Sequence, residues 1–532
     1  MATIVCFREE EWCSFNCGII SLVTEISGGL VLQFRWKKLL FVSIGIVLLC
    51  HCSYMKPLRQ PQSAEAKLRT ELDLAFDDPA FSNAHWGVMV QSLKNGEVLY
   101  ARNAHKNFIP ASNMKLFTTA TALIKLGPEY RYRTQFYING TIDEQGTLHG
   151  DLIVVGSGDP SITGRYYFGE VTKPLEAWAD SLKAHRIRAI DGHIIGDDNL
   201  FDDEIMGEGW AWDYQSDWYA AQINALSFND NCINIYLSPG DSIGAPAKYR
   251  LVPETDYATI INHVVTVRSG LEQEIKFKRK LGTNRVEISG AIALNSPARL
   301  DWFAIDNPAQ FTVTVFQRVL QQKGISVYGQ AYDIDDLNGY HYAQSPAALL
   351  FQFESPPLRE IVETINKVSQ NLYAELLLRT LGVHFRGIGS ASAGIAVVKE
   401  FLSTIGIDSN QFVMVDGSGL SRLNMVTPQQ IVTLLRYMRN SPQRDYFYQS
   451  LPIAGNDGTL KNRMVRTAAE GNVRAKTGFV GYARALSGYI VTADNEELAF
   501  SMIANNYSVP TSMANVIQDL VCERLANFSR SQ

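Results

Sequence analysis

The hydrophobic pattern changes twice along the chain, near residue 130 and again near residue 350. Before the first change, residues 86–92 and 97–101 form two largely apolar runs on either side of an Asn-Gly turn at 94–96. Two such runs around this turn predict a β-hairpin. The apolar run between Pro110 and Gly127 is bounded by residues that begin and end helices. We therefore expect strand, strand and helix, with the strands in an antiparallel sheet.

Between residues 131 and 349 the pattern becomes one of short alternating strands that are separated by turns. Glycine follows Asn, Gln, Asp or Pro at these turns, as in Asn139-Gly140 and Asp191-Gly192, and such pairs favour reverse turns. The strand-like segments run from TQFYING to RVEISGAIAL. This texture predicts one or two β-rich domains.

Helical patterns return after Ser355 and are followed by a final group of strands and one more helix. We expect a helix at 427–438, strands at 474–478, 485–492 and 498–504, and a helix at 511–528. These elements match those before residue 130 in kind, so both parts should form one domain. The sequence thus predicts an α+β, multidomain protein, in which a discontinuous domain (residues 67–130 plus 350–532) is interrupted by β-rich residues 131–349.

The first 52 residues contain an apolar run, Leu39 to Leu49, that follows Arg35, Lys37 and Lys38. This run is short for a membrane span and suits the core of a signal peptide. We predict an exported, periplasmic or cell-envelope protein. Cleavage near residue 50, lipid attachment there, and a membrane anchor retained through residues 35–52 remain alternatives, and residues 53–66 are expected to form a polar linker.

The composition excludes several other classes of protein. The net charge is −6 with no long basic run, which argues against nucleic-acid binding. Five of the seven cysteines precede residue 53, and Cys232 and Cys522 are expected to be buried thiols rather than a disulfide or a zinc site. The acidic clusters at 197–198 and 202–204 lack calcium-loop spacing, so we expect solvated loops there, with a calcium site as the alternative. We expect neither a metal nor a cofactor.

Ser112 and Lys115 form an S-x-x-K pattern in the helix that is predicted after Pro110. Residues three apart lie on the same helix face, so the lysine can reach the serine. A serine hydroxyl must lose its proton to act as a nucleophile. Desolvation and a nearby positive charge would lower the lysine pKa enough for it to accept that proton.

Two segments match a second pattern, S-x-N, which supplies a hydroxyl and a carboxamide. They are Ser369-Gln370-Asn371 and Ser227-Phe228-Asn229. Pattern alone does not separate the two. We favour Ser369 and Asn371 because an amphipathic helix follows them and because they lie between the other two motifs.

The third pattern is Lys476-Thr477-Gly478 at the start of a predicted strand. The lysine adds positive potential, and the threonine hydroxyl can bind a carboxylate. Glycine would let a substrate backbone lie flat against the strand edge. S-x-x-K, S-x-N and K-T-G in this chain order are the parts of a penicillin-binding serine acyltransferase site.

With these motifs, and with SQNLYAELLLR, DGSGLSR, GSGDPS and RALSGYI, the chain resembles the class C low-molecular-mass penicillin-binding proteins over residues 64–525. These are D-alanyl-D-alanine carboxypeptidases that also act as endopeptidases. The resemblance implies a β-lactamase/transpeptidase-like domain, with an antiparallel sheet covered by helices on both faces and a helical lobe. It also implies inserted domains between the first two motifs.

The resemblance implies a role for each matching position. Ser112 would be the acylated nucleophile, Lys115 its base, Ser369 a proton relay and Asn371 a substrate clamp, while Lys476, Thr477 and Gly478 would bind the terminal carboxylate and backbone. The N–H groups of Ser112 and Phe479 would form the oxyanion hole. Arg422 would contact the substrate or form a structural ion pair. Phe479 departs from the Thr or Ser of the family and removes one hydroxyl.

These roles predict a serine-type DD-peptidase that acts on peptidoglycan stem peptides and crosslinks and is acylated by β-lactams at Ser112. Two alternatives are kept. One is a β-lactamase or esterase on the same scaffold, against which the long insertion argues. The other is a non-catalytic cell-wall-binding protein, against which the intact motifs argue.

Overall fold

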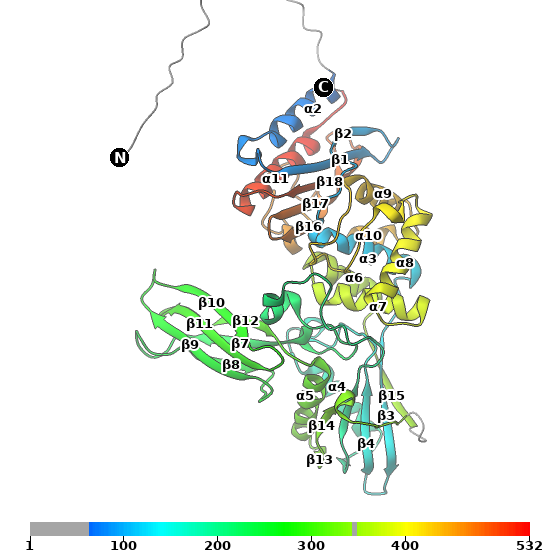
Figure 1. Cartoon of the computed structure of the whole chain (residues 1–532), viewed down its shortest axis with the longest axis vertical. Helices are drawn as coiled ribbons and strands as arrows, with labels where there is room; N and C mark the ends of the chain where they lie inside the picture. The colour runs from blue at the N-terminus through cyan, green and yellow to red at the C-terminus, as the bar shows by residue number, and fades with distance from the viewer. Residues whose placement is uncertain (1–62, 343–347, 532) are drawn as a thin grey trace, which may run out of the picture. The chain divides into compact units, whose positions relative to one another are not determined.

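Both ends of the described chain meet in one antiparallel sheet with the strand order β16-β17-β18-β1-β2. The computed structural model describes residues 63–342 and 348–531 (Figure 1). The strands are β1 (His85–Ser92), β2 (Val98–Arg102), β16 (Arg474–Val480), β17 (Ala483–Val491) and β18 (Glu497–Asn505). Strand β1 pairs with β18 from His85↔Asn505 to Ser92↔Leu498. The predicted hairpin and the predicted antiparallel sheet are confirmed.

The two faces of this sheet pack against different helices because successive side chains of a strand point to opposite faces. Leu486 and Ile490 of β17 share a core with α2 (Ala64–Phe76) and α11 (Thr511–Asn527). The neighbouring Ala485 and Tyr489 belong to the core of the helical lobe on the other face. Figure 1 shows α2 and α11 side by side along the sheet. The expected arrangement, a sheet between two helical layers, is confirmed.

The helical lobe consists of six α-helices around one apolar core. They are α3 (Met114–Lys125), α6 (Leu358–Lys367), α7 (Asn371–Arg386), α8 (Ala391–Thr404), α9 (Pro428–Arg439) and α10 (Arg444–Ser450). A short 3₁₀ turn, η2 (Ala111–Asn113), leads into α3. Within residues 63–342 and 348–531 no single helix is long and apolar enough to cross a membrane, although α7 and α8 together, bent by 77°, pass that test by length and composition.

A seven-stranded sheet and two helices form the first part of the segment between the motifs. Its strands are β3 (Arg133–Ile142), β4 (Thr147–Val155), β5 (Ala189–Ile190), β6 (Ile194–Asp197), β13 (Ser326–Val327), β14 (Ala331–Asp333) and β15 (Ala348–Glu354). The helices α4 (Lys173–Ala184) and α5 (Pro308–Gln322) pack on it, with Trp178 against Phe316. Sequence analysis missed both helices, although Leu175, Trp178 and Leu182 recur at helical spacing.

Two three-stranded sheets make up the second part of this segment. One contains β7 (Cys232–Ser238), β8 (Lys248–Val252) and β12 (Arg299–Ala304); the other contains β9 (Thr259–Val267), β10 (Gln273–Arg279) and β11 (Arg285–Ala293). The β9–β11 pair is parallel. Cys232 and Cys522 are both buried and free, as predicted.

Two predicted boundaries need correction. Helix α2 begins at Ala64, capped by Ser63, so the last residues of the predicted 53–66 linker are helical. Strand β15 pairs with β3 as far as Glu354, so the inserted sheet continues beyond residue 349. The rest of the linker and the predicted signal peptide, anchor or lipid site fall in residues 1–62, outside the described residues.

Candidate active site

The backbone before Ser112 is held in an unusual conformation by two close contacts. Ala111 has φ +47, in the left-handed region that is costly for a residue with a side chain. A Cβ built on Gly419 would lie 1.8 Å from the Ala111 carbonyl oxygen, so only glycine fits there. On the other side, Nδ2 of Asn113 donates to the Lys476 carbonyl oxygen at 3.0 Å. Ser112 is therefore positioned between strand β16 and the turn that contains Gly419.

Lys115 contacts Ser112 directly. Its Nζ lies 3.0 Å from Ser112 Oγ, 2.5 Å from Asn371 Oδ1 and 2.7 Å from the Ser418 carbonyl oxygen. An ammonium group has three donors, and these three acceptors use all of them. When the lysine is neutral, the two other acceptors keep the remaining N–H bonds, and the lone pair can face the serine hydroxyl.

The Lys115 side chain is completely buried. Burial lowers the pKa of Lys115 to about 7, while the carboxylates of Asp416 and Glu375 oppose that shift. Near neutral pH a substantial fraction of this lysine is therefore unprotonated. A general base works best when its pKa lies near the operating pH, so Lys115 is suited to accept the proton of Ser112.

Ser369 lies in a tight turn between α6 and α7. It has φ +62, a strained value that is often found at functional sites. Its Oγ accepts a hydrogen bond of 2.8 Å from Lys476 Nζ. Gln370 caps α7 with its side chain, and Nδ2 of Asn371 donates to the Tyr219 carbonyl oxygen at 2.7 Å. The turn thus directs Ser369 towards one lysine and Asn371 towards the other.

Lys476 is the second buried lysine of the site. Burial lowers its pKa, and the positive charges of Lys115 and Arg484 lower it further. An anionic ligand beside Lys476 would counteract both causes, because an opposite charge favours the ammonium form. The site is therefore suited to a ligand with a carboxylate.

Strand β16 places the K-T-G residues against the segment that contains Ser112. Thr477 is buried, and its hydroxyl donates to the hydroxyl of Thr459 at 2.7 Å. A Cβ on Gly478 would lie 2.6 Å from the Pro110 carbonyl oxygen. Packing within the protein therefore requires glycine here, which is a different reason from the substrate contact that the sequence suggested. Phe479 is 55% exposed, with its side chain at the surface.

Within residues 63–342 and 348–531, Arg422 does not form the ion pair that was one of its two expected roles. Its guanidinium donates to the Gly481 carbonyl oxygen in the turn between β16 and β17. This bond connects the DGSGLSR segment to the K-T-G hairpin. Arg422 is half-buried there, and contact with a substrate stays a prediction.

The side-chain hydrogen bonds of Ser227 and Asn229, in the S-x-N alternative, go to nearby residues of the same segment. Ser227 Oγ donates to the Asn224 carbonyl oxygen, and Asn229 bonds to Cys232 and Asn234. Of the two candidates, it is Ser369 and Asn371 that contact the buried lysines.

Comparison with known proteins agrees with this geometry. Residues 68–527 match the D-Ala-D-Ala carboxypeptidase 3 (S13) family. The chain belongs to this family. A D-alanyl-D-alanine carboxypeptidase of Actinomadura sp. (strain R39) is 34% identical over 477 residues, covering 88% of this chain and 86% of the relative. The resemblance that the motifs indicated, and with it the class of enzyme, is confirmed.

Solved structures show the same fold. Penicillin binding protein 4 (dacB) from Haemophilus influenzae matches with a TM-score of 0.72 at 25% identity, over 86% of this chain and 97% of that chain. Its structure complexed with a novel β-lactam matches with a TM-score of 0.68 at 24% identity, over 86% and 98% of the two chains.

Two buried carboxylates of this S13 family member were missed by sequence analysis. Glu375 accepts the N–H groups of Gly417 and Ser418 at 3.1 and 2.8 Å. Asp416 accepts the N–H of Gly419 at 2.8 Å. Together they order the turn whose Ser418 carbonyl oxygen contacts Lys115. The available signal was that Glu375 follows Asn371 by four residues and so shares its helix face.

The inserted segment of this S13 protein also contributes residues that sequence analysis missed. Besides the Tyr219 carbonyl oxygen, Nε1 of Trp210 donates to Asp416 Oδ2 at 2.9 Å. Asp230 accepts hydrogen bonds from Tyr373 at 2.8 Å and from Gln370 at 3.3 Å. The insertion therefore contacts Asn371, which bonds to Lys115, and Gln370, which follows Ser369.

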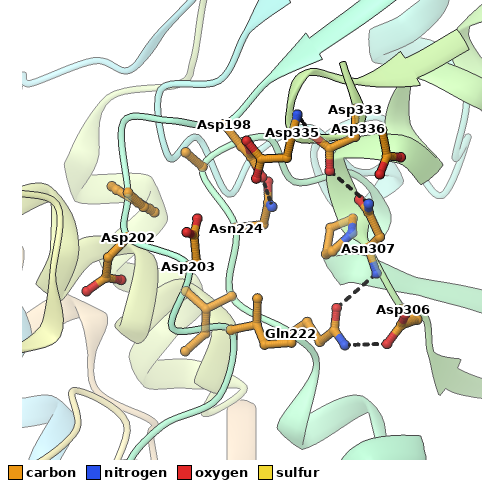
Figure 2. A pocket seen from close by; sticks show the side chains of 15 residues that line it. Asp198, Asp202, Asp203, Gln222, Asn224, Asp306, Asn307, Asp333, Asp335 and Asp336 are labelled. Atoms are coloured by element: carbon orange, nitrogen blue, oxygen red, sulfur yellow. Dashed lines mark hydrogen bonds between the residues drawn. The ribbon is translucent and has the colours of Figure 1, made fainter. Parts of the chain in front are cut away.

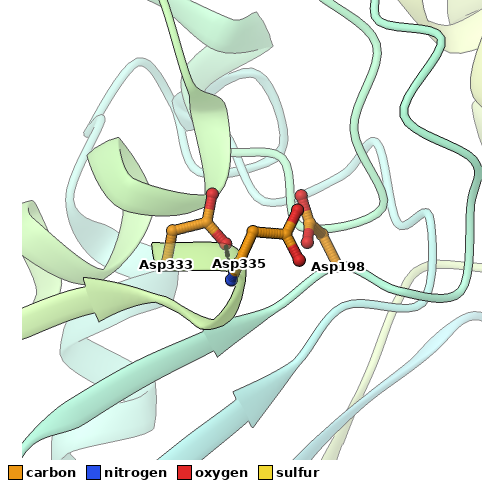
Figure 3. Close-up of side chains that lie close together, drawn as sticks. All are labelled: Asp198, Asp333 and Asp335. Carbon is orange, nitrogen blue, oxygen red and sulfur yellow. Dashed lines mark hydrogen bonds between the residues drawn. The ribbon is translucent and has the colours of Figure 1, made fainter. Parts of the chain in front are cut away.

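A separate acidic pocket of about 240 Å³ lies within the inserted segment (Figure 2). Asp198, Asp333 and Asp335 place oxygens within 4.8 Å of one another (Figure 3). Sequence analysis had instead considered Asp198 together with Asp197 and residues 202–204, and it did not include Asp333 or Asp335. Burial, followed by the charge of Asp333, raises the pKa of Asp198 to about 7. The amides of Asn224 and Asn307 donate to Asp198 and Asp333, so protein donors and protonation relieve the charge of these carboxylates.

Proposed function

We propose that this chain is a serine-type D-Ala-D-Ala carboxypeptidase of peptidoglycan stem peptides that acts through an acyl-enzyme on Ser112. The decisive observation is the 3.0 Å contact between Ser112 Oγ and the buried Nζ of Lys115. Burial lowers the pKa of Lys115 to about 7. The same site contains a second lysine, which suits a peptide that ends in a carboxylate. Membership of the S13 family supports this function.

In the acylation step, Ser112 Oγ attacks the carbonyl carbon between two D-alanines while Lys115 accepts its proton. The resulting oxyanion would lie near the N–H groups of Ser112 and Phe479, a role that stays a prediction. Collapse of the tetrahedral intermediate breaks the C–N bond, and the leaving amine takes up the proton that Lys115 accepted from Ser112. Ser369 would relay this proton: its Oγ accepts a hydrogen bond of 2.8 Å from Lys476, which leaves its own O–H free to donate to the amine. Lys115 is neutral again when the amine leaves.

In the deacylation step, water attacks the ester on Ser112 and regenerates the free serine. Lys115 is again the base within reach of the reacting oxygen. In the crosslink between D-alanine and a diamino acid, the carbonyl that is attacked also belongs to D-alanine, and only the leaving amine differs. An endopeptidase activity would therefore use the same steps. No metal or cofactor takes part in this scheme.

β-Lactams would acylate the same serine because their strained amide resembles the scissile bond. A β-lactam complex of the Haemophilus influenzae relative supports this proposal. The substrate lies in the cell envelope, so we also propose that the protein is exported, with residues 35–52 as signal peptide or anchor.

Mass spectrometry of the intact protein after incubation with benzylpenicillin tests the proposal. We expect one penicilloyl adduct on wild type and none on Ser112→Ala, and release of D-alanine from an acyl-D-Ala-D-Ala peptide by wild type alone. Ser227→Ala serves as the matched serine control and should keep the adduct. An adduct that persists on Ser112→Ala, or rapid β-lactam turnover without D-alanine release, would contradict it.

A further inference from the structure

The hydroxyl that faces outward beside the K-T-G strand belongs to Thr459, not to Thr477. A hydroxyl group has one proton to donate, and Thr477 donates its proton to Thr459 Oγ1 at 2.7 Å. Thr477 is 4% exposed, whereas Thr459 is exposed. Among the described residues the Thr459 hydroxyl has no acceptor of its own. The donor available to a ligand at this point is therefore the O–H of Thr459.

The loop that contains Thr459 is fixed to the end of α6. Asp457 forms an ion pair with Lys367 at 2.5 Å and accepts the Ile453 N–H at 2.8 Å. A Cβ on Gly458 would lie 2.5 Å from the Lys367 carbonyl oxygen, so the two segments are in close contact. Lys367 is the last residue of α6, two positions before Ser369. The Thr459 hydroxyl is thus held close to the turn that Lys476 contacts.

Strand β16 itself offers no free side-chain hydroxyl to a ligand. The strand runs Arg474–Val480 with the sequence RAKTGFV, in which Thr477 is the single hydroxyl residue. Position 479 is phenylalanine, and its exposed ring has no donor. Lys476 can supply charge, but its Nζ already donates to Ser369 and to the Thr477 carbonyl oxygen.

We propose that Thr459 determines the specificity for a free carboxylate: its hydroxyl donates a hydrogen bond to the terminal carboxylate of the peptide, and Thr477 orients that hydroxyl from behind. Lys476 supplies the positive charge beside it. This inference rests on the proposed carboxypeptidase function, since it concerns how the same site binds the leaving D-alanine. Hydrogen bonds to charged groups are stronger than neutral ones, so one hydroxyl suffices to discriminate.

The experiment compares two substrates that differ only at the end of the peptide. One is an acyl-D-Ala-D-Ala peptide with a free carboxylate, and the other is its C-terminal amide. The quantity measured is the ratio of their kcat/KM values. Thr459→Val keeps the side-chain shape and removes the hydroxyl, while Thr459→Ser keeps the hydroxyl. Thr70→Val is the control, because Thr70 is exposed on α2 across the sheet.

We expect wild type, Thr459→Ser and Thr70→Val to prefer the carboxylate substrate. In Thr459→Val the ratio of kcat/KM for the carboxylate substrate to kcat/KM for the amide substrate should fall at least about 10-fold. This is the effect expected for the loss of one hydrogen bond to a charged group. The loss should appear in kcat/KM for the carboxylate substrate, with the amide substrate almost unchanged. Thermal unfolding confirms that each variant is folded, since penicillin carries a carboxylate of its own and would report on the same interaction.

An unchanged ratio in Thr459→Val, or an equal loss on both substrates, would overturn the inference, because a purely structural role affects the two alike. Failure of the proposed function looks different. In that case wild type itself releases no D-alanine from the carboxylate substrate, and the inference falls with it.

Discussion

Nζ of Lys115 lies 2.5 Å from Oδ1 of Asn371, and this contact joins helices α3 and α7 across 256 positions of sequence. The other end of the same carboxamide donates to the Tyr219 carbonyl oxygen at 2.7 Å. Asn371 therefore orients Lys115. One N–H and one lone pair remain for the substrate clamp that the sequence predicted.

Ser369 and Ser227 allow a direct comparison between the two S-x-N motifs. We expect Ser369→Ala to lower kcat/KM for D-alanine release by about 10²-fold or more, because it removes a group placed for proton transfer. Ser227→Ala should keep activity and lose about 1 kcal/mol of stability with its buried hydrogen bond. Steady-state kinetics with thermal unfolding measure both. Equal kinetic effects in the two variants would contradict the assignment of Ser369.

The rate of acylation should rise with pH through the pKa of Lys115, about 7. Below this value the lysine is protonated and cannot accept the serine proton; above it the base is free. Glu375 and Asp416 raise the pKa of this lysine, and Lys476 is the cation nearby. Burial raises the pKa of Glu375 itself to about 7, so this residue carries part of a negative charge near neutral pH, and removing that charge destabilises the ammonium form. Glu375→Gln should therefore move the half-maximal pH downward, by roughly half a unit to one unit.

Stopped-flow acylation by a chromogenic β-lactam between pH 5 and 9 measures this shift. Glu363→Gln, at an exposed position of α6, is the control and should leave the profile in place. A lower plateau without a shift in Glu375→Gln would indicate that Glu375 supports only the structure of the turn.

Alanine substitutions at Gly478 and Gly481 test whether the close packing of β16 is needed for stability and for acylation. A methyl group on Gly478 would lie 2.6 Å from the Pro110 carbonyl oxygen, whereas one on Gly481 meets nothing within 4 Å. We expect Gly478→Ala to cost about 1–3 kcal/mol of stability through overpacking and to slow penicillin acylation, since it displaces the segment before Ser112. Gly481→Ala should be close to wild type in both measurements. Thermal unfolding and the rate of penicillin labelling measure both effects. If β16 can shift to accommodate the methyl group, Gly478→Ala will behave like Gly481→Ala, which would contradict the prediction.

Asp230 connects the inserted segment to the catalytic turn. It accepts hydrogen bonds from Arg165 at 2.7 Å, from Tyr373 at 2.8 Å and from Gln370 at 3.3 Å. Asp230→Asn should lower kcat by roughly 10-fold with little change in KM, because it loosens Gln370 and Tyr373, which follow Ser369 at the start of α7. Asp241→Asn, in an exposed ion pair, is the control. A change in KM alone would place Asp230 in substrate binding instead.

The main elements of the catalytic domain could be predicted because their signals are local. Short apolar runs and the turn at 94–96 predicted β1, β16, β17 and β18, and the sequence also predicted α9 and α11, with boundaries within a few residues. The three motifs could be recognised because residue type and spacing set what each can do. The helices α4 and α5 were missed because the surrounding strands dominated the pattern of that segment.

The sequence by itself determined the family, the order of the motifs and the residues able to serve as nucleophile and base. Only the tertiary structure decided how these groups act together. The pKa of Lys115 depends on complete burial, the choice between Ser227 and Ser369 on a bond to Lys476, and the need for Gly419 and Gly478 on the carbonyl oxygens of Ala111 and Pro110. Desolvation and close contact between distant segments arise from packing, and local sequence patterns do not contain that information.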